Sequence, residues 1–416
     1  MHHEIALIST IAIGLVYALI GGYIASRLGL PPLVGYLLAG VAEGPFTPGF
    51  VADAKLAPQL AEIGVILLMF GVGMHFSVRD LLAVRKVAVP GALVQIAAAV
   101  ALTCGLAGLW GLSFGTSLVL GLALSVASTV VLLRALEAQG ILGSESGRIA
   151  VGWLIVEDLI TVVVLVLLPA LATSLGGQPI GNNSPGAGND GAPLLLTLGI
   201  VLAKFAGFVV FMLLVGARLL PWLLERVART NSRELFTLAV VATAIGVGFG
   251  AAELLGLSFA LGAFFAGVVL GESDHSHRAT VEMQPLQDAF TALFFVAIGM
   301  LFDPSILVRR PLEVLTVVTV VVLGKPAAAL LIVLVCRYPL GVALIVATSL
   351  AQIGEFSFIL AEIGIALRLL SAEGQSLIVA GALISITLNS FLVRGAVAVQ
   401  HRLASPPNPQ GTHVSN

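Results

Sequence analysis

The stretch GWLIVEDLITVVVLVLLPAL, from Gly152 to Leu171, is long enough and apolar enough to cross a lipid bilayer. It nevertheless holds two adjacent carboxylates, Glu157 and Asp158. On the insertion scale, each charged group at the centre of a membrane costs about 3 kcal/mol. Acidic residues at this depth are therefore typical of ion sites and proton relays, and each needs a partner. The stretch predicts a membrane-spanning helix that carries a functional carboxylate pair.

The composition indicates a polytopic membrane protein. The chain has 416 residues, of which 58% are hydrophobic and 10% are charged. Its mean hydropathy of +1.09 excludes a soluble globular domain. Apolar runs follow one another along the chain, separated mostly by short turns. We predict an all-α fold with about thirteen transmembrane helices, near residues 5–26, 33–50, 57–76, 87–111, 115–138, 146–175, 194–225, 233–253, 256–271, 285–303, 310–336, 340–364 and 373–400.

Basic residues are distributed unevenly between the two sides of this topology. The side that we call arginine-rich carries Arg27, Arg79, Arg85, Lys86, Arg134, Arg148, Arg226, Arg229, Arg233, Arg278, Arg337 and Arg402. The opposite side carries Lys55, Arg309, Arg310 and Arg368. The positive-inside rule makes the arginine-rich side cytoplasmic, which predicts an outside N-terminus and a cytoplasmic C-terminus.

We expect one transmembrane domain over residues 1–416. A stretch rich in glycine, asparagine and proline, residues 176–193, predicts a flexible external linker, and residues 405–416 predict a disordered tail. The linker separates two halves, which cover about residues 30–175 and about residues 256–400.

The two halves resemble each other at a nearly constant offset of about 226 residues. LVGYLLAGVAEG (33–44) matches ALGAFFAGVVLG (260–271), and LLMFGVGMHFS (67–77) matches LFFVAIGMLFD (293–303). Spans rich in small residues can look alike because such residues let helices pack closely, but two matches at one offset favour gene duplication. The first pair begins the second and the ninth predicted spans, which cross the membrane in opposite directions. The predicted repeat is therefore inverted, which is typical of secondary transporters.

The same offset aligns ALSVASTVVLLRAL (123–136) with SLAQIGEFSFILAE (349–362). Polar or flexible residues interrupt both spans halfway, namely Ser125, Ser128, Thr129, Gln352, Gly354 and Glu355. These interruptions predict two broken helices, whose unwound backbone would offer carbonyl oxygens to a cation. The alternative is that the serine and threonine hydroxyls bond back to their own helix.

A family resemblance rests on four strings. They are LPPLVGYLLAGVAEGPFTPG (30–49), ELLGLSFALGAFFAGVVLGES (253–273), ALFFVAIGMLFD (292–303) and SLAQIGEFSFIL (349–360). The chain resembles the membrane domain of the monovalent cation:proton antiporter-2 family, and within it the Kef-type and YbaL-like branch, over roughly residues 5–400. The resemblance implies a sodium/proton antiporter-like fold in a bacterial cytoplasmic (inner) membrane. It also implies a homodimer with a dimerising panel, a moving core and two crossing broken helices beside an acidic ion site.

Matched residue by residue, the resemblance assigns roles to several side chains. Asp158 occupies the position of the ion- and proton-binding aspartate, the ligand for K⁺ or Na⁺, and Glu157 occupies the preceding position. Lys325, in VVLGKPAAA, matches a lysine that is a charge partner for the acid pair. The residues matched to the crossing helices are Ser128 and Thr129 in the first and Gln352 and Glu355 in the second, with Ser125 as further support.

Physical chemistry gives the carboxylates and the lysine separate tasks. Neighbours on a helix point about 100° apart, so one of Glu157 and Asp158 can bind an ion while the other holds a partner. Lys325 is the natural partner, because a lone ammonium among apolar residues is costly. The alternative is that Lys325 snorkels to the surface. Glu355 is equally consistent with a ligand and with a structural hydrogen-bonding residue.

Other features of the chain depart from the family pattern. The loop from His275 to Phe290 is not strongly acidic, which argues against glutathione-type gating. No strand followed by GxGxxG is present, so we expect no C-terminal nucleotide-binding domain, and a cytosolic regulatory domain would be separate or deleted. Glu43 stands where the family usually has a small apolar residue, and its role is unexplained.

The favoured hypothesis is a secondary transporter that exchanges a monovalent cation, K⁺ or Na⁺, for protons. The alternative is a gated K⁺ efflux channel. We expect no enzyme, no cofactor beyond the transported ions and no nucleic-acid partner. An intramembrane aspartyl protease would need a GxGD string, and a primary pump would need GxxxxGK[ST]; neither string occurs.

Overall fold

The computed structural model describes residues 2–47, 57–75, 78–178 and 194–404. Most of the predicted linker and the whole predicted tail lie outside the described residues. The helices are α1 (His2–Arg27), α2 (Pro32–Glu43), α3 (Ala57–Met74), α4 (Val78–Gly108), α5 (Phe114–Ser125), α6 (Thr129–Ala138), α7 (Glu145–Leu171), α8 (Leu194–Phe211), α9 (Ala217–Ala228), α10 (Arg233–Leu255), α11 (Phe259–Gly271), α12 (Ser276–Met300), α13 (Ile306–Arg309), α14 (Pro311–Thr319), α15 (Lys325–Val335), α16 (Leu340–Ser349), α17 (Glu355–Ala366) and α18 (Ala372–Ala404). Short π-helical turns join α8 to α9 and α14 to α15.

The helices confirm the predicted polytopic membrane fold. Each predicted span coincides with one helix or with two consecutive helices. Among the described residues, 8 helical stretches are long and apolar enough to cross a membrane. The shorter apolar helices are Pro32–Glu43, Gln59–Met74, Phe259–Gly271 and Leu340–Ser349.

Some helix ends differ from the predicted ends. α4 begins at Val78 and α12 at Ser276, each nine residues before the predicted start, at 87 and 285. Their first turns are polar, and hydropathy alone does not mark a helix that continues from the membrane into water. α2 ends at Glu43 and not at residue 50, because Gly44 is extended and precedes Pro45. A residue before proline is disfavoured in the helical conformation.

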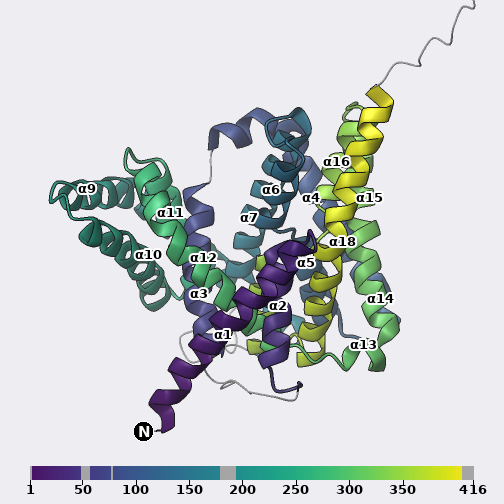
Figure 1. Ribbon diagram of the computed structural model, residues 1–416, viewed down its shortest axis with the longest axis horizontal. Helices are drawn as coiled ribbons and strands as arrows, with labels where there is room; N and C mark the ends of the chain where they lie inside the picture. Colours follow the sequence, from purple (N-terminus) through teal and green to yellow (C-terminus); the bar gives the residue numbers. More distant parts are fainter. Residues whose placement is uncertain (1, 48–56, 76–77, 179–193, 405–416) are drawn as a thin grey trace, which may run out of the picture.

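The helices pack as two groups. We call α1–α3 with α8–α12 the panel, because α3 packs against both α11 and α12, and α2 against α1 and α12. We call α4–α7 with α14–α18 the core bundle, in which α4 packs against α5, α7 and α15, and α16 packs against α18. In Figure 1, α9, α10 and α11 lie on one side of the molecule, and α14, α15, α16 and α18 on the other.

Close helix contacts within the panel depend on glycine. A Cβ atom on Gly40 of α2 would overlap the carbonyl oxygen of Val296 in α12. A Cβ atom on Gly299 of α12 would overlap the carbonyl oxygen of Leu37 in α2. The two backbones therefore touch, as small residues allow in membrane helices.

The contact between α3 and α11 has the same geometry. A Cβ atom on Gly267 would overlap the carbonyl oxygen of Phe70, and one on Gly73 would overlap the carbonyl oxygen of Phe264. These four residues stand at the predicted repeat offset from the four residues of the α2–α12 contact. The two halves of the panel thus repeat one packing contact, which supports the repeat inferred from the sequence.

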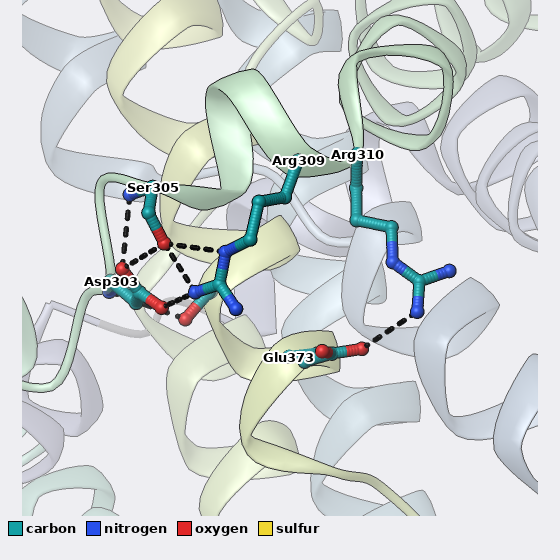
Figure 2. Close-up of polar contacts among 6 residues, drawn as sticks. Asp303, Ser305, Arg309, Arg310 and Glu373 are labelled. Atoms are coloured by element: carbon teal, nitrogen blue, oxygen red, sulfur yellow. Dashed lines mark hydrogen bonds and ion pairs between the residues drawn. The ribbon is translucent and has the colours of Figure 1, made fainter.

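A polar cluster holds the turn that follows α12. The Asp303 carboxylate accepts hydrogen bonds from the backbone nitrogen of Ser305 at 3.0 Å and from its hydroxyl at 2.6 Å. Arg309 forms an ion pair with the same carboxylate, and its Nε donates to the Ser305 hydroxyl at 2.8 Å (Figure 2). These contacts hold the pKa of Asp303 below its ordinary value of 3.8.

The next arginine connects two helices. Arg310 pairs with Glu313 in the first turn of α14 at 2.8 Å and with Glu373 in the first turn of α18 at 3.5 Å. Figure 2 shows the Arg310 side chain directed toward Glu373. The start of α14 is therefore tied to the start of α18 at the surface.

Candidate functional site

The first crossing helix is broken as predicted. α5 ends at Ser125 and α6 begins at Thr129, with extended backbone between them. The Ser128 hydroxyl caps α6 by accepting a hydrogen bond from the backbone nitrogen of Val131 at 3.2 Å. Serine is a favoured N-cap residue, and this local bond competes with continuation of the helix.

The second broken helix crosses the first at its break. α16 ends at Ser349 and α17 begins at Glu355. The backbone nitrogen of Gly354 donates to the carbonyl oxygen of Val126 at 3.1 Å. A Cβ atom on Gly354 would overlap the Ala127 carbonyl, so this crossing requires glycine.

Gln352 connects the two unwound segments. Its side-chain oxygen accepts from the Ser128 nitrogen at 2.9 Å, and its side-chain nitrogen donates to the Ser128 carbonyl at 3.0 Å. Its own carbonyl accepts a hydrogen bond from the Lys325 ammonium at 2.9 Å. All three residues are buried. The Ser128 nitrogen and the Gln352 carbonyl, which have no helical partner among the described residues, are thus satisfied by buried side chains.

The two carboxylates face different groups, as adjacent positions on a helix require. Glu157 Oε2 accepts a hydrogen bond from the backbone nitrogen of Ala127 at 3.0 Å. Asp158 Oδ2 accepts one from the Thr129 hydroxyl at 3.2 Å. Among the described residues, the other oxygen of each carboxylate has no hydrogen-bond partner. The exposed fractions are 0% for Glu157 and 5% for Asp158, so a buried acceptor on each is available for an ion or a proton.

The contacts of the remaining predicted site residues, Lys325, Ser125 and Glu355, differ from one residue to the next. Lys325 is fully buried, so it does not snorkel. Within the described residues it forms no ion pair with Glu157 and donates instead to Gln352. Ser125 bonds back to the Leu122 carbonyl at 2.7 Å, which is the alternative that the sequence left open. Glu355 is buried, and neither carboxylate oxygen has a hydrogen-bond partner in the described part of the chain.

The sequence interpretation missed two polar residues beside the breaks. Gln95 of α4 donates to the carbonyl oxygen of Ser125 at 2.9 Å, and accepts from the Trp153 indole nitrogen at 3.3 Å. Asn389 of α18 donates to the carbonyl oxygen of Thr348 at 2.6 Å. Gln95 is a lone polar residue in an apolar span, which is the signal that marked Lys325, whereas Asn389 stands beside Thr387 and Ser390 and carries no such signal.

A cavity of about 580 Å³ reaches Asp158 and Thr129 between the panel and the core bundle. Its panel wall comes from α2, α3, α11 and α12, and its other wall from α6 and α7. The exposed side chains of Arg134, Glu137, Gln284 and Asp288 also line it. They belong to the second half of α6 and the first half of α12, so the cavity opens toward the arginine-rich side.

Glu43 is not part of this cavity. It is fully buried at the end of α2, and neither of its carboxylate oxygens has a hydrogen-bond partner among the described residues. Its Oε2 lies beside Gly14 of α1, where a built Cβ atom would be 3.4 Å away. The structure gives no account of this buried acid beyond its position in the panel.

Comparisons with known proteins agree with this architecture. The family profile described as "Sodium/hydrogen exchanger, transmembrane" matches residues 15–398. YbaL of Escherichia coli (strain K12), which is named as a cation/proton antiporter, is 56% identical over 392 residues, covering 94% of this chain and 69% of YbaL. K(+) efflux antiporter 4 of Arabidopsis thaliana is 32% identical over 400 residues, covering 96% of this chain and 65% of that protein.

A solved structure has the same fold. The sodium proton antiporter MjNhaP1 of Methanocaldococcus jannaschii superposes with a TM-score of 0.73 at 17% identity, covering 96% of this chain and 100% of that one. The crossing broken helices and this likeness define a polytopic membrane protein with the sodium/proton antiporter-like fold. The chain belongs to the sodium/hydrogen exchanger family.

Proposed function

We propose that this protein exchanges a monovalent cation, K⁺ or Na⁺, for protons by alternating access at Asp158. One observation carries the proposal: a buried carboxylate with an unpaired oxygen lines the cavity that separates the panel from the core bundle. The names of the relatives, a cation/proton antiporter and a K⁺ efflux antiporter, describe the same class of transport.

Asp158 would couple the two ions by competition. Its carboxylate binds either a proton or a cation, and the Thr129 hydroxyl orients one of its oxygens. Unwound carbonyl groups beside it would replace part of the hydration shell of the cation. If the empty, charged site cannot cross the membrane, each cation that moves one way requires protons to move the other way.

The neighbouring residues would keep the site in place. Glu157 holds the first break through the nitrogen of Ala127, and Lys325 holds the second through the carbonyl of Gln352. The positive charge of Lys325 also offsets the two carboxylates, so these groups would titrate as a coupled set. Both breaks are thus fixed by ionisable side chains that lie next to the site.

Alternating access would come from motion of the core bundle against the panel. The cavity reaches Asp158 from the arginine-rich side, so the structure corresponds to one of the two access states of such a cycle. We infer from the positive-inside rule that this side is cytoplasmic, in a bacterial inner membrane, with the N-terminus outside. A homodimer formed through the panel, with a regulatory domain on another segment or chain, fits the same scheme.

The proposal is tested by cation-driven proton movement in proteoliposomes, with Na⁺ and K⁺ measured separately. We expect a proton signal for the native protein and none for Asp158→Asn. Glu225→Gln, on the exposed part of α9, is a matched control that should keep the signal. Cation flux without proton movement that persists in Asp158→Asn would contradict exchange and favour a channel.

A further inference from the structure

A second cavity lies on the arginine-rich side; it shares Arg134 with the cavity of Asp158, but Asp158 does not line it. Its volume is about 290 Å³, and it lies between the turn that joins α1 to α2, at Gly29 to Pro32, and the helices α6 and α18. Arg134 and Arg394 line it together with Gln139 and Ser390. No carboxylate is among its described lining residues, so its chemistry is cationic and polar.

Both arginines are available to an anion. Arg134 and Arg394 are exposed, and neither forms an ion pair within the described residues. Arg394 donates to the Ser390 carbonyl at 2.9 Å and lies over the Phe391 ring at 4.8 Å, which leaves further guanidinium donors free. Arg134 lines both this cavity and the cavity of Asp158, whereas Glu137, one turn further along α6, lines only the cavity of Asp158.

An apolar groove of about 380 Å³ follows the seam between α1 and α2. Gly21 and Gly35 both line it, and the two backbones touch there, because a Cβ atom on either glycine would overlap the carbonyl oxygen of the other. Leu30 lines both the groove and the arginine cavity, so the two meet at that residue. From Tyr17 to Leu28 the groove follows α1 for about 16 Å at 1.5 Å per residue, which suits an acyl chain.

We propose that the cavity and the groove together bind one anionic phospholipid. The phosphate headgroup would lie between Arg134 and Arg394, whose planar guanidinium groups match phosphate geometry, and one acyl chain would lie along the seam. Basic pockets between membrane helices are typical headgroup sites. A soluble phosphate would satisfy the arginines but would leave the adjoining apolar groove without a role. The bound lipid would contact both the panel and the core bundle.

Native mass spectrometry of the whole protein in detergent tests this proposal. Phosphatidylglycerol and phosphatidylcholine are titrated separately, and the retained lipids are counted. We expect phosphatidylglycerol binding to weaken roughly fivefold for each of Arg134→Gln and Arg394→Gln, from the contribution of one charge near a membrane surface. Arg226→Gln, which removes an arginine that lies over Trp222 on α9, is the matched control and should bind as the native protein does. Phosphatidylcholine binding should be equal in all forms, which also shows that each variant is folded.

A groove-filling variant separates the lipid from a soluble anion. Ala42 lines the far part of the groove, and Ala42→Phe should weaken phosphatidylglycerol binding with both arginines intact. Unchanged phosphatidylglycerol binding in that variant would assign the arginines to a soluble anion and overturn the proposal. So would inorganic phosphate that binds the native protein as tightly as phosphatidylglycerol, or equal lipid retention by the native protein and the double arginine variant.

Discussion

Gln352 is the residue on which the crossing of the two broken helices depends most directly. Its side chain bonds to both the nitrogen and the carbonyl of Ser128. Among the described residues the buried nitrogen has no other partner, whereas the carbonyl also accepts from the Leu132 nitrogen of α6 at 3.1 Å. Gln352→Leu would leave only the Ser128 nitrogen unpaired, because the carbonyl keeps its bond from Leu132. We expect a loss of about 1–3 kcal/mol in the free energy of unfolding, the cost of one buried donor without a partner.

Gln352→Glu is the matched comparison at this position. It keeps the acceptor for the Ser128 nitrogen and loses only the second donor to the Ser128 carbonyl, so its stability should lie between those of the native protein and the leucine variant. Thermal unfolding in lipid nanodiscs measures the order. A leucine variant as stable as the native protein would show that the amide bridge is not needed to hold the crossing.

Glu43 is a residue whose substitution should raise the free energy of unfolding instead of lowering it. A buried carboxylate without a partner is costly, and the residue at the matching position of the second half is Leu270. We expect Glu43→Leu to raise the free energy of unfolding by about 1–3 kcal/mol, whereas Glu43→Gln, which stays polar, should change it less. The measurement is again thermal unfolding. Lower stability of Glu43→Leu would mean that the carboxylate has a functional or structural partner.

At this scale, the sequence predicted which polar residues lie at the helix breaks better than it predicted their contacts. Gln352, Lys325 and the Glu157–Asp158 pair are polar groups in apolar spans, and burying such groups is costly enough to demand partners. The partner of Lys325 was not predictable from the sequence, because backbone carbonyls become acceptors only where a helix unwinds. Gln95 is a lone polar group of the same kind, and its role became visible only with the break beside it.

At the scale of elements, the turn after α12 contributes a stabilisation that depends on pH through Asp303. Hydrogen bonds from Ser305 and the ion pair with Arg309 lower the pKa of Asp303 from 3.8. As the pH falls, Asp303 therefore binds a proton at a higher pH in the unfolded chain than in the folded one. The stabilisation is complete above about pH 4 and is lost as the pH falls through the lower pKa of the folded state.

Asp303→Asn tests whether the stabilisation by charged Asp303 is lost as the pH falls. Because the cluster lies at the surface, we expect the variant to lose less than about 1 kcal/mol at neutral pH. The difference from the native protein should stay constant from pH 7 to pH 5 and shrink below pH 4. Thermal unfolding in nanodiscs across this range checks it. A difference that grows as the pH falls would show that the charged form of Asp303 does not stabilise the turn.

The repeat shows how far elements could be predicted from the sequence. Matched glycines such as Gly40 and Gly267 marked equivalent helices, because only glycine allows two backbones to touch. The helix ends were less predictable. The polar first turn of α12 carries no hydropathy signal, and the end of α2 depends on Pro45.

At the scale of the whole molecule, the positions of the two cavities suggest a different role for each cavity. The cavity that contains Asp158 lies between the panel and the core bundle, so its shape must change when they move. The arginine cavity also contacts both bodies, but from the membrane surface. Lipid bound there would therefore alter the relative stability of the access states without contacting Asp158.

One-sided access to Asp158 is the property that most clearly separates an exchanger from an open pore. Gln287 of α12 lines the cavity, so in a background of Cys104→Ala and Cys336→Ala we expect Gln287→Cys to react with a membrane-impermeant maleimide from the arginine-rich side. Glu373→Cys, in the first turn of α18, is the control and should react from the opposite side. Labelling rates in vesicles of known orientation measure both. Because an exchanger opens its site to one side at a time, reaction of Gln287→Cys at equal rates from both sides would indicate a continuous pathway and a channel.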